Sequence, residues 1–297
     1  MNITITGSLG NIGRPLTTQL VAKGHRVTLI SHNPERAAAI EQLNAIPMIG
    51  SLDDPDLLLR AFENADAVFT MIPPGFHAPD VREYMRRMGE KYVRAIDQAR
   101  VRYVVNLSSV GADLPAGPGP TGVNHEIEQR MDASGDVHVL HLRPGMFYTN
   151  FFGNIPMIRA QQLIGNNFDA GVGMLLTHPR DIAAAACLAL DTLSFSGKNI
   201  QYIVGAETNG GEVAQALGGA IGKPELRWMH FSDEDLLQGL MQSGFTRDMA
   251  SVYVVEIGVA LREGRMLDHY RRNKDKSVGG TSLADFAREF AAVYSKL

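Results

Sequence analysis

Residues 3–13 read ITITGSLGNIG, a short apolar run that leads directly into a turn with three glycines. Behind the turn, Ile12, Leu16 and Leu20 recur at helical spacing, and Gly24 ends the helix. Glycine lets a backbone turn sharply and approach a pyrophosphate closely, and the free N–H groups of a helix amino end attract its charge. This order of elements predicts a dinucleotide-binding turn formed by Gly7, Ser8, Leu9, Gly10, Asn11, Ile12 and Gly13.

Strand and helix patterns alternate outward from this turn, as in a parallel sheet that helices cover on both faces. Apolar runs predict further strands at 26–30, 47–50, 67–72, 103–107 and 137–142. We therefore expect an α/β fold in which residues 1–150 form an NAD(P)-binding Rossmann domain with a doubly wound parallel sheet. Residues 151–297 are expected to form a mixed region, with a smaller carboxy-terminal substrate lobe and a returning strand at 200–204.

The composition limits the classes of partner. The 297 residues are 45% hydrophobic and 20% charged, which suits a packed globular protein. The net charge is −4, and the bases of residues 261–276 alternate with acids, so we expect no direct nucleic-acid contact. No apolar run reaches the ~20 residues of a membrane helix, and no membrane partner is expected. The single cysteine, Cys187, excludes a disulfide framework, so we expect a reducing, cytoplasmic location. The oligomeric state stays open.

The end of the second predicted strand bears on the choice between NAD and NADP. An acid there would accept a hydrogen bond from the ribose 2′-hydroxyl of NAD and repel the 2′-phosphate of NADP. The chain reads ISHNPER over residues 30–36, without an acid directly at the strand end. We expect Ser31, His32, Asn33 and Arg36 to contact the phosphate, which favours NADP and leaves NAD as the alternative. A second interpretation is that Ser31 and Asn33 only shape a turn and cap the following helix.

Other strand ends should also meet the cofactor, because the carboxyl ends of parallel strands lie along one edge of the sheet. A loop rich in proline and glycine, residues 112–122, is expected to lie over this edge. The further cofactor contacts that we expect there are Met71, Ile72, Pro73, Ser108, Ser109 and Pro144.

Several short segments follow the glycine turn in a specific order: NPER at 33–36, LSSVG at 107–111, LRPGMFYTN at 142–150 and DIA at 181–183. Together with residues 217–224, they resemble the NmrA-like, atypical branch of the short-chain dehydrogenase/reductase superfamily over nearly the whole chain. The resemblance implies a Rossmann domain, a small carboxy-terminal substrate lobe, NADP(H) as ligand and a cleft between the two parts. Members of this branch are reductases of quinones, dyes and phenylpropanoid-like compounds, or nucleotide-sensing regulators.

The catalytic tyrosine of the wider superfamily has no counterpart here. Its reductases place a lysine four residues after a tyrosine acid, whose pKa the ammonium lowers, and this chain contains no Y-x-x-x-K. Thirteen residues after Ser108 stands Thr121, and four further on stands His125. A threonine hydroxyl is a poor acid, which argues against alcohol dehydrogenation but permits hydride delivery to a conjugated acceptor. His125 either holds the ribose, donates a proton, or is a surface histidine near a helix start. With only Glu126 and Glu128 beside it, no metal is expected.

Aromatic and apolar residues follow three strand ends and suit a flat acceptor. The expected substrate walls are Phe76, His77, Val110, Met146, Phe147, Tyr148 and Asn150. Alternatively, the aromatic side chains of this region, including Phe151 and Phe152, only bury the junction between the lobes. The sequence therefore predicts an NAD(P)H-dependent oxidoreductase that reduces a quinone-like or conjugated carbonyl acceptor by hydride transfer. The alternative is an NADP-binding redox-sensing regulator without turnover.

Overall fold

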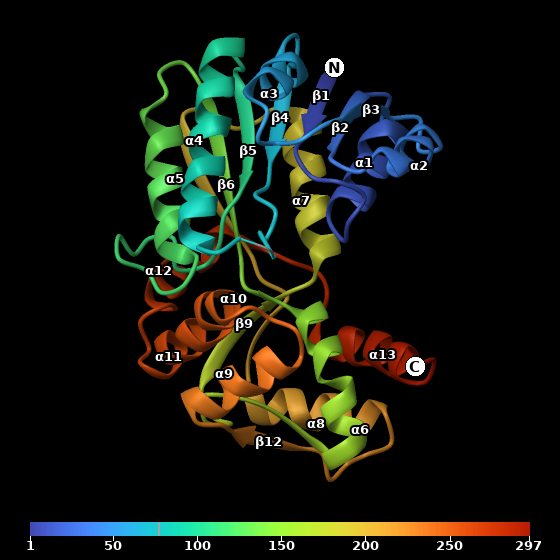
Figure 1. Ribbon diagram of the computed structural model, residues 1–297, viewed down its shortest axis with the longest axis vertical. Helices are drawn as coiled ribbons and strands as arrows, with labels where there is room; N and C mark the ends of the chain where they lie inside the picture. The colour runs from blue at the N-terminus through green and yellow to red at the C-terminus, as the bar shows by residue number, and fades with distance from the viewer. Residues whose placement is uncertain (77) are drawn as a thin grey trace.

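An eight-stranded parallel sheet forms the upper half of the molecule in Figure 1. The computed structural model describes residues 1–76 and 78–297. The strands lie in the order β13-β10-β6-β5-β4-β1-β2-β3, and each pairs in parallel with its neighbours. The order reverses between β1 and β4, which confirms the predicted Rossmann-type, doubly wound α/β fold. The strand bounds are β1 Asn2–Ile5, β2 Arg26–Ser31, β3 Ile46–Ile49, β4 Ala67–Thr70, β5 Tyr103–Leu107, β6 His138–Pro144, β10 Lys198–Ile203 and β13 Ser277–Val278.

Helices cover both faces of this sheet (Figure 1). On one face α1 (Gly13–Ala22) packs against α7 (Pro179–Thr192). On the other face α3 (Pro55–Phe62), α4 (Val81–Ala99) and α5 (Thr121–Ala133) lie side by side. The 3₁₀ turn η1 (Pro34–Arg36) and α2 (Ala37–Glu41) connect β2 to β3.

The long helix α4 illustrates how the sequence sets these faces. Its amino end is capped by Asp80, whose carboxylate accepts a hydrogen bond from the Glu83 N–H at 2.8 Å. Its carboxyl end is Arg100, in the left-handed region at a φ of 55°. Met88 and Tyr92 recur at helical spacing between these ends, and both are buried. The apolar stripe of α4 therefore fixes the face that packs into the core.

A second core lies in the carboxy-terminal lobe, below the main sheet in Figure 1. The rings of Tyr148 and Phe286 stack with centroids 4.8 Å apart, and those of Phe152 and Phe290 stack at 5.8 Å. Two small sheets, β11-β9-β7 and β12-β8, belong to this lobe. Its elements are β7 Met146–Phe147, η2 Tyr148–Asn154, α6 Ile155–Gln161, β8 Leu163–Asn166, β9 Gly173–Thr177, β11 Ala206–Asn209, α8 Gly210–Ala220, β12 Arg227–His230, α9 Asp233–Gln242, α11 Glu256–Arg262, α12 Asp268–Arg272, η4 Lys274–Lys276 and α13 Leu283–Tyr294.

The two halves of the chain are interwoven. β10 and β13, from the second half, complete the main sheet beside β6. The short helix α10 (Arg247–Ala250) and the π-helical turn η3 (Ser251–Val255) also return toward the first half, because Met249 and Val252 are buried in the core formed with α4 and α5. The division of the chain at residue 150 stays a prediction.

Two further features bear on the setting of the protein. No helix among the described residues is long and apolar enough to cross a membrane. Cys187 lies buried on α7, and burial raises the pKa of its thiol, so a reactive thiolate is not favoured there.

Candidate functional site

The glycine turn between β1 and α1 closes tightly at two of its three glycines. A Cβ at Gly13 would lie 2.1 Å from the Ser8 carbonyl oxygen, and a Cβ at Gly7 would lie 2.4 Å from Met71 Cε. Gly10 is different: it is exposed, and no atom of the residues that the structure describes lies within 4 Å of the position of its Cβ. The turn therefore leaves open space above Gly10, so a pyrophosphate can approach the backbone there. The other positions of the turn are a buried Ile12, a half-buried Leu9 and an exposed Asn11.

Met71, the residue that follows β4, lies beside the glycine turn and is held by hydrogen bonds. The Met71 N–H donates to Thr6 Oγ1 at 2.8 Å, which ends β4 at Thr70 instead of continuing to Ile72 as expected. The Met71 carbonyl accepts from the Tyr92 hydroxyl at 3.0 Å, and burial raises the pKa of this tyrosine. Met71 is thus fixed from both sides, and Ile72 and Pro73 follow it as half-buried residues.

A cation stands beside the turn at the end of β2. Arg36 Nη1 donates to Ser8 Oγ at 2.7 Å, and Ser8 Oγ donates to Ser31 Oγ at 3.1 Å. Ser31 is buried, whereas Arg36 and His32 are exposed. Asn33 caps η1, because its Oδ1 accepts from the Glu35 N–H at 2.9 Å. The side chains of Arg36 and His32 are thus available to an anion, while the Asn33 carbonyl oxygen is already occupied.

The two serines that follow β5 differ in their hydrogen bonds: one hydroxyl donates and the other accepts. Ser108 Oγ donates to Glu128 Oε1 at 2.5 Å, so its proton is already used. Ser109 Oγ accepts from Asn124 Nδ2 at 3.0 Å, and no acceptor for its own proton lies within hydrogen-bond distance among the described residues. Ser109 is half-buried, and its hydroxyl can therefore donate to a ligand. Asn124 and Glu128 were not predicted as site residues; their i,i+4 spacing, which puts both on one face of α5, is the signal that points to them.

Ser108 is the first member of a series of buried, hydrogen-bonded polar side chains that no sequence motif predicted. Glu128 pairs with Arg143, whose Nε donates to Oε1 at 3.0 Å, and both residues are buried. Arg143 Nη1 also donates to the Tyr202 hydroxyl at 3.4 Å, and that hydroxyl bonds His269 Nδ1 at 2.6 Å. Burial lowers the pKa of His269 and so favours its neutral form. This chain ties β5, α5, β6 and β10 together at their site ends, and it stiffens the position of Ser108.

The side chains of Thr121 and His125 both form hydrogen bonds with the loop that precedes α5. Thr121 is buried, and its Oγ1 donates to the Pro118 carbonyl at 2.7 Å. His125 Nδ1 lies 2.9 Å from the Ala112 carbonyl oxygen; because a carbonyl only accepts, Nδ1 carries a proton. The half-buried His125 ring then offers Nε2 to other partners. The Thr121 hydroxyl, in contrast, is not free to serve as an acid.

The residues expected to line the acceptor site are distributed over several environments. Phe76 is 60% exposed, Met146 and Phe147 are half-buried, and Asn150 is exposed. Val110 is 5% exposed and belongs to the core of the carboxy-terminal lobe, although its N–H donates to the carbonyl of the buried Pro144 at 2.9 Å. His77, which was also expected to line the acceptor site, lies outside the described residues.

Tyr148 requires a correction. It is fully buried, it stacks on Phe286, and its hydroxyl donates to the Thr281 carbonyl at 3.3 Å. Burial raises the pKa of Tyr148 to about 12. Its ring therefore belongs to the core under α13 and does not line an open cleft. Phe151 is likewise buried in this core, so it too does not line an open cleft.

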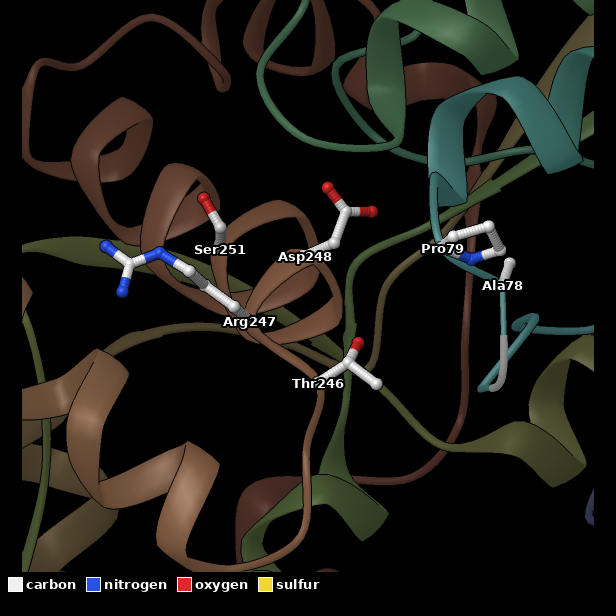
Figure 2. Close-up of a pocket in the computed structure, with 6 residues that line it drawn as sticks. All are labelled: Ala78, Pro79, Thr246, Arg247, Asp248 and Ser251. Carbon is white, nitrogen blue, oxygen red and sulfur yellow. The ribbon is translucent and has the colours of Figure 1, made fainter.

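A pocket of about 480 Å³ lies between the loop after β4 and the α10 segment. Figure 2 shows Ala78 and Pro79 on one side of it, and Thr246, Arg247, Asp248 and Ser251 on the other. The pocket thus joins the nucleotide-binding half to the segment that leads into the carboxy-terminal lobe. Among the residues that the structure describes, no cluster of three His, Cys, Asp or Glu side chains is arranged to hold a metal ion.

The parallel sheet with its glycine turn defines a nucleotide-binding protein of the Rossmann class. Residues 7–149 match the family described as NAD(P)H-binding. A curated relative, an uncharacterised protein of Schizosaccharomyces pombe, is 35% identical over 68 residues, 23% of each chain. The chain spans less than a quarter of the length of the curated relatives that it matches.

Two solved structures share the fold over nearly the whole chain. An NADPH-dependent quinone oxidoreductase from Escherichia coli, complexed with NADPH, is 19% identical, with a TM-score of 0.81 and coverage of 97% of this chain and 99% of that one. The triphenylmethane reductase of Citrobacter sp., complexed with NADP(H), is 19% identical, with a TM-score of 0.82 and the same coverage. The predicted NAD(P)H-binding segment and the predicted Rossmann-type fold are thereby confirmed.

Proposed function

We propose that the protein is an NADPH-dependent oxidoreductase that reduces a quinone-like or conjugated carbonyl acceptor by hydride transfer. The observation that carries the proposal is the contact of Arg36 with Ser8, which puts a cation against the glycine turn at the end of β2. Among the described residues no carboxylate forms an ion pair with Arg36, so its charge is available to a 2′-phosphate. The solved structures of similar fold with NADPH or NADP(H) bound support the same cofactor.

The residues present fit this cofactor at each of its charged parts. The open backbone at Gly10 and the first turn of α1 would bind the pyrophosphate, and Arg36 with His32 would bind the 2′-phosphate. His125 Nε2 would accept from a ribose hydroxyl, because its Nδ1 proton is held by Ala112. A bound NADPH would supply the hydride.

The hydrogen-bond polarity of the site supports an acceptor that needs little acid or base assistance. Removal of a proton from an alcohol requires a free base, but Ser108 donates to the paired Glu128 and Thr121 donates to Pro118. Ser109 retains a proton to donate, and it would polarise a carbonyl oxygen of the acceptor. Such a hydrogen bond, together with orientation beside the nicotinamide, suffices for a quinone or an enone, whose product oxygens take protons from water.

The test is turnover by the purified full-length chain. NADPH oxidation is followed by absorbance with a benzoquinone, a naphthoquinone and an enone, and the reverse direction is tested with a secondary alcohol and NADP⁺. We expect turnover with the conjugated acceptors and none with the alcohol. Gly10→Asp, which blocks the turn, is the matched control and should show no turnover. Tight NADPH binding without turnover of any acceptor would refute the proposal and favour the redox-sensing regulator.

A further inference from the structure

The carboxylate of Glu256 ties three segments together where the two halves of the molecule meet. Glu256 is the first residue of α11, and its Oε2 accepts from the Gly119 N–H at 2.9 Å. The same oxygen pairs with the guanidinium of Arg82 in the first turn of α4. Oε1 accepts from Ser251 Oγ at 3.4 Å, within the π-helical turn. One side chain thus links α11, α4 and the loop over the site end of the sheet.

The loop at residues 108–120 has little freedom where Glu256 holds it. Gly119 lies in the left-handed region at a φ of 54°, and a Cβ there would be 2.2 Å from the Val252 carbonyl oxygen. The loop backbone therefore packs directly on the π-helical turn. Glu256 thus holds the end of the loop, whereas the His125 ring is bonded farther back, at Ala112.

A second carboxylate supports the same junction. Asp248 Oδ2 accepts from the Val81 N–H at 2.7 Å, at the first residue of α4. Asp248 also lines the pocket, and Figure 2 shows it between Ser251 and the opposite wall of Ala78 and Pro79. The walls of this pocket come from the loop before α4 and from the α10 segment, so their separation depends on how these segments are held together.

We propose that Glu256 is a positioning residue for acceptor binding. It holds α4 and the 108–120 loop against the carboxy-terminal lobe and thereby sets the separation of the pocket walls, and we assign this pocket to the acceptor as part of the proposal. This inference rests on the proposed function. The glycine turn lies on β1 and α1 and shares none of these contacts, so the proposed pyrophosphate and 2′-phosphate contacts, which account for most of the NADPH affinity, do not depend on Glu256.

The experiment compares two variants of the full-length chain with a matched control. Glu256→Ala removes both hydrogen-bond acceptors, whereas Glu256→Gln loses the charge but keeps an oxygen that can accept from Gly119. Glu263→Gln is the control, because Glu263 is an exposed acid just after α11 whose ion-pair partner is Arg265. With a naphthoquinone as probe, we expect the KM to rise about tenfold in Glu256→Ala and less in Glu256→Gln. The kcat and the NADPH dissociation constant should stay near wild type.

Hydrogen exchange gives a readout that does not need turnover. In Glu256→Ala, the amides of residues 78–82 and 111–120 should exchange faster, while those of β1 and α1 should not change. An unchanged KM, an equal loss of NADPH affinity, or faster exchange across the whole fold would overturn the inference. If wild type reduces no acceptor, the proposed function fails by itself, and the exchange pattern alone then decides whether Glu256 holds the junction.

Discussion

Replacement of Arg36 by alanine tests the cofactor assignment most directly. The side chain is exposed and donates one hydrogen bond, to Ser8 Oγ at 2.7 Å, so its removal leaves no buried group without a partner. A hydrogen bond to a charged group contributes about 1.5–3 kcal/mol, and screening by solvent and salt favours the lower end at an exposed site. With about 1.4 kcal/mol per tenfold change, the NADPH dissociation constant should rise about tenfold. NADH has no 2′-phosphate and should bind the variant and the wild type alike.

Calorimetry with both cofactors measures this difference on the folded protein. Arg26→Ala is the matched control, because Arg26 is an exposed arginine at the amino end of the same strand, β2. It removes the same charge at the end of the strand away from the turn. The effect of Arg36→Ala should shrink as ionic strength rises. An unchanged ratio of NADPH to NADH affinity in Arg36→Ala, or an equal shift in Arg26→Ala, would refute the assignment of the phosphate site.

Three further outcomes are expected. Gly10→Asp should abolish dinucleotide binding and retain the fold, because the side chain has space but its charge opposes the pyrophosphate; calorimetry beside a thermal melt checks both parts. Thr121→Val should change the rate of quinone reduction little, because that hydroxyl already donates within the protein, whereas His125→Ala should lower it; a large loss in the valine variant would make the hydroxyl an acid. Asp233→Asn should destabilise the fold near neutral pH. A hydrogen bond from Arg262 lowers the pKa of Asp233 from 3.8 to about 2, so the carboxylate stabilises above pH 3.8 and loses this effect as the pH falls toward 2. Unfolding curves of variant and wild type should converge in acid; a constant difference at every pH would contradict this.

The glycine turn and its flanking strand and helix could be predicted because the pattern that marks them is local in sequence. The strand, the three glycines and the helix stand within residues 3–22, and Arg36 reaches Ser8 from the 3₁₀ turn after the next strand. Strand periodicity placed β5 at its observed bounds and β2 within one residue, because buried parallel strands are continuous apolar runs. β4 ends earlier than expected, because the Met71 N–H donates to the Thr6 hydroxyl. A run of apolar residues in the sequence does not predict such a side-chain hydrogen bond.

The acceptor side was harder to predict because its contacts are distant in sequence. Tyr148 follows a strand end and is aromatic, which suggested a substrate wall, yet it packs on Phe286 of a helix near the end of the chain. No local pattern at residue 148 reports that partner. Glu128 is also paired with a distant residue, Arg143 on β6, and a charged residue in a helix is ordinarily expected to face solvent.

This difference has a consequence for how the two specificities are determined. The proposed pyrophosphate and 2′-phosphate contacts belong to two adjacent strand ends of one sheet, so we expect a few substitutions within residues 7–36 to change the choice of cofactor. The pocket opposite combines the loop before α4 with the α10 segment, and Met249 and Val252 anchor that segment in the core of the first half. Substitutions at Thr246 or Arg247 can therefore change the pocket wall without moving its anchor. With the acceptor in this pocket, as proposed, we expect acceptor preference to change at positions outside the proposed nucleotide contacts, while the cofactor preference stays constant.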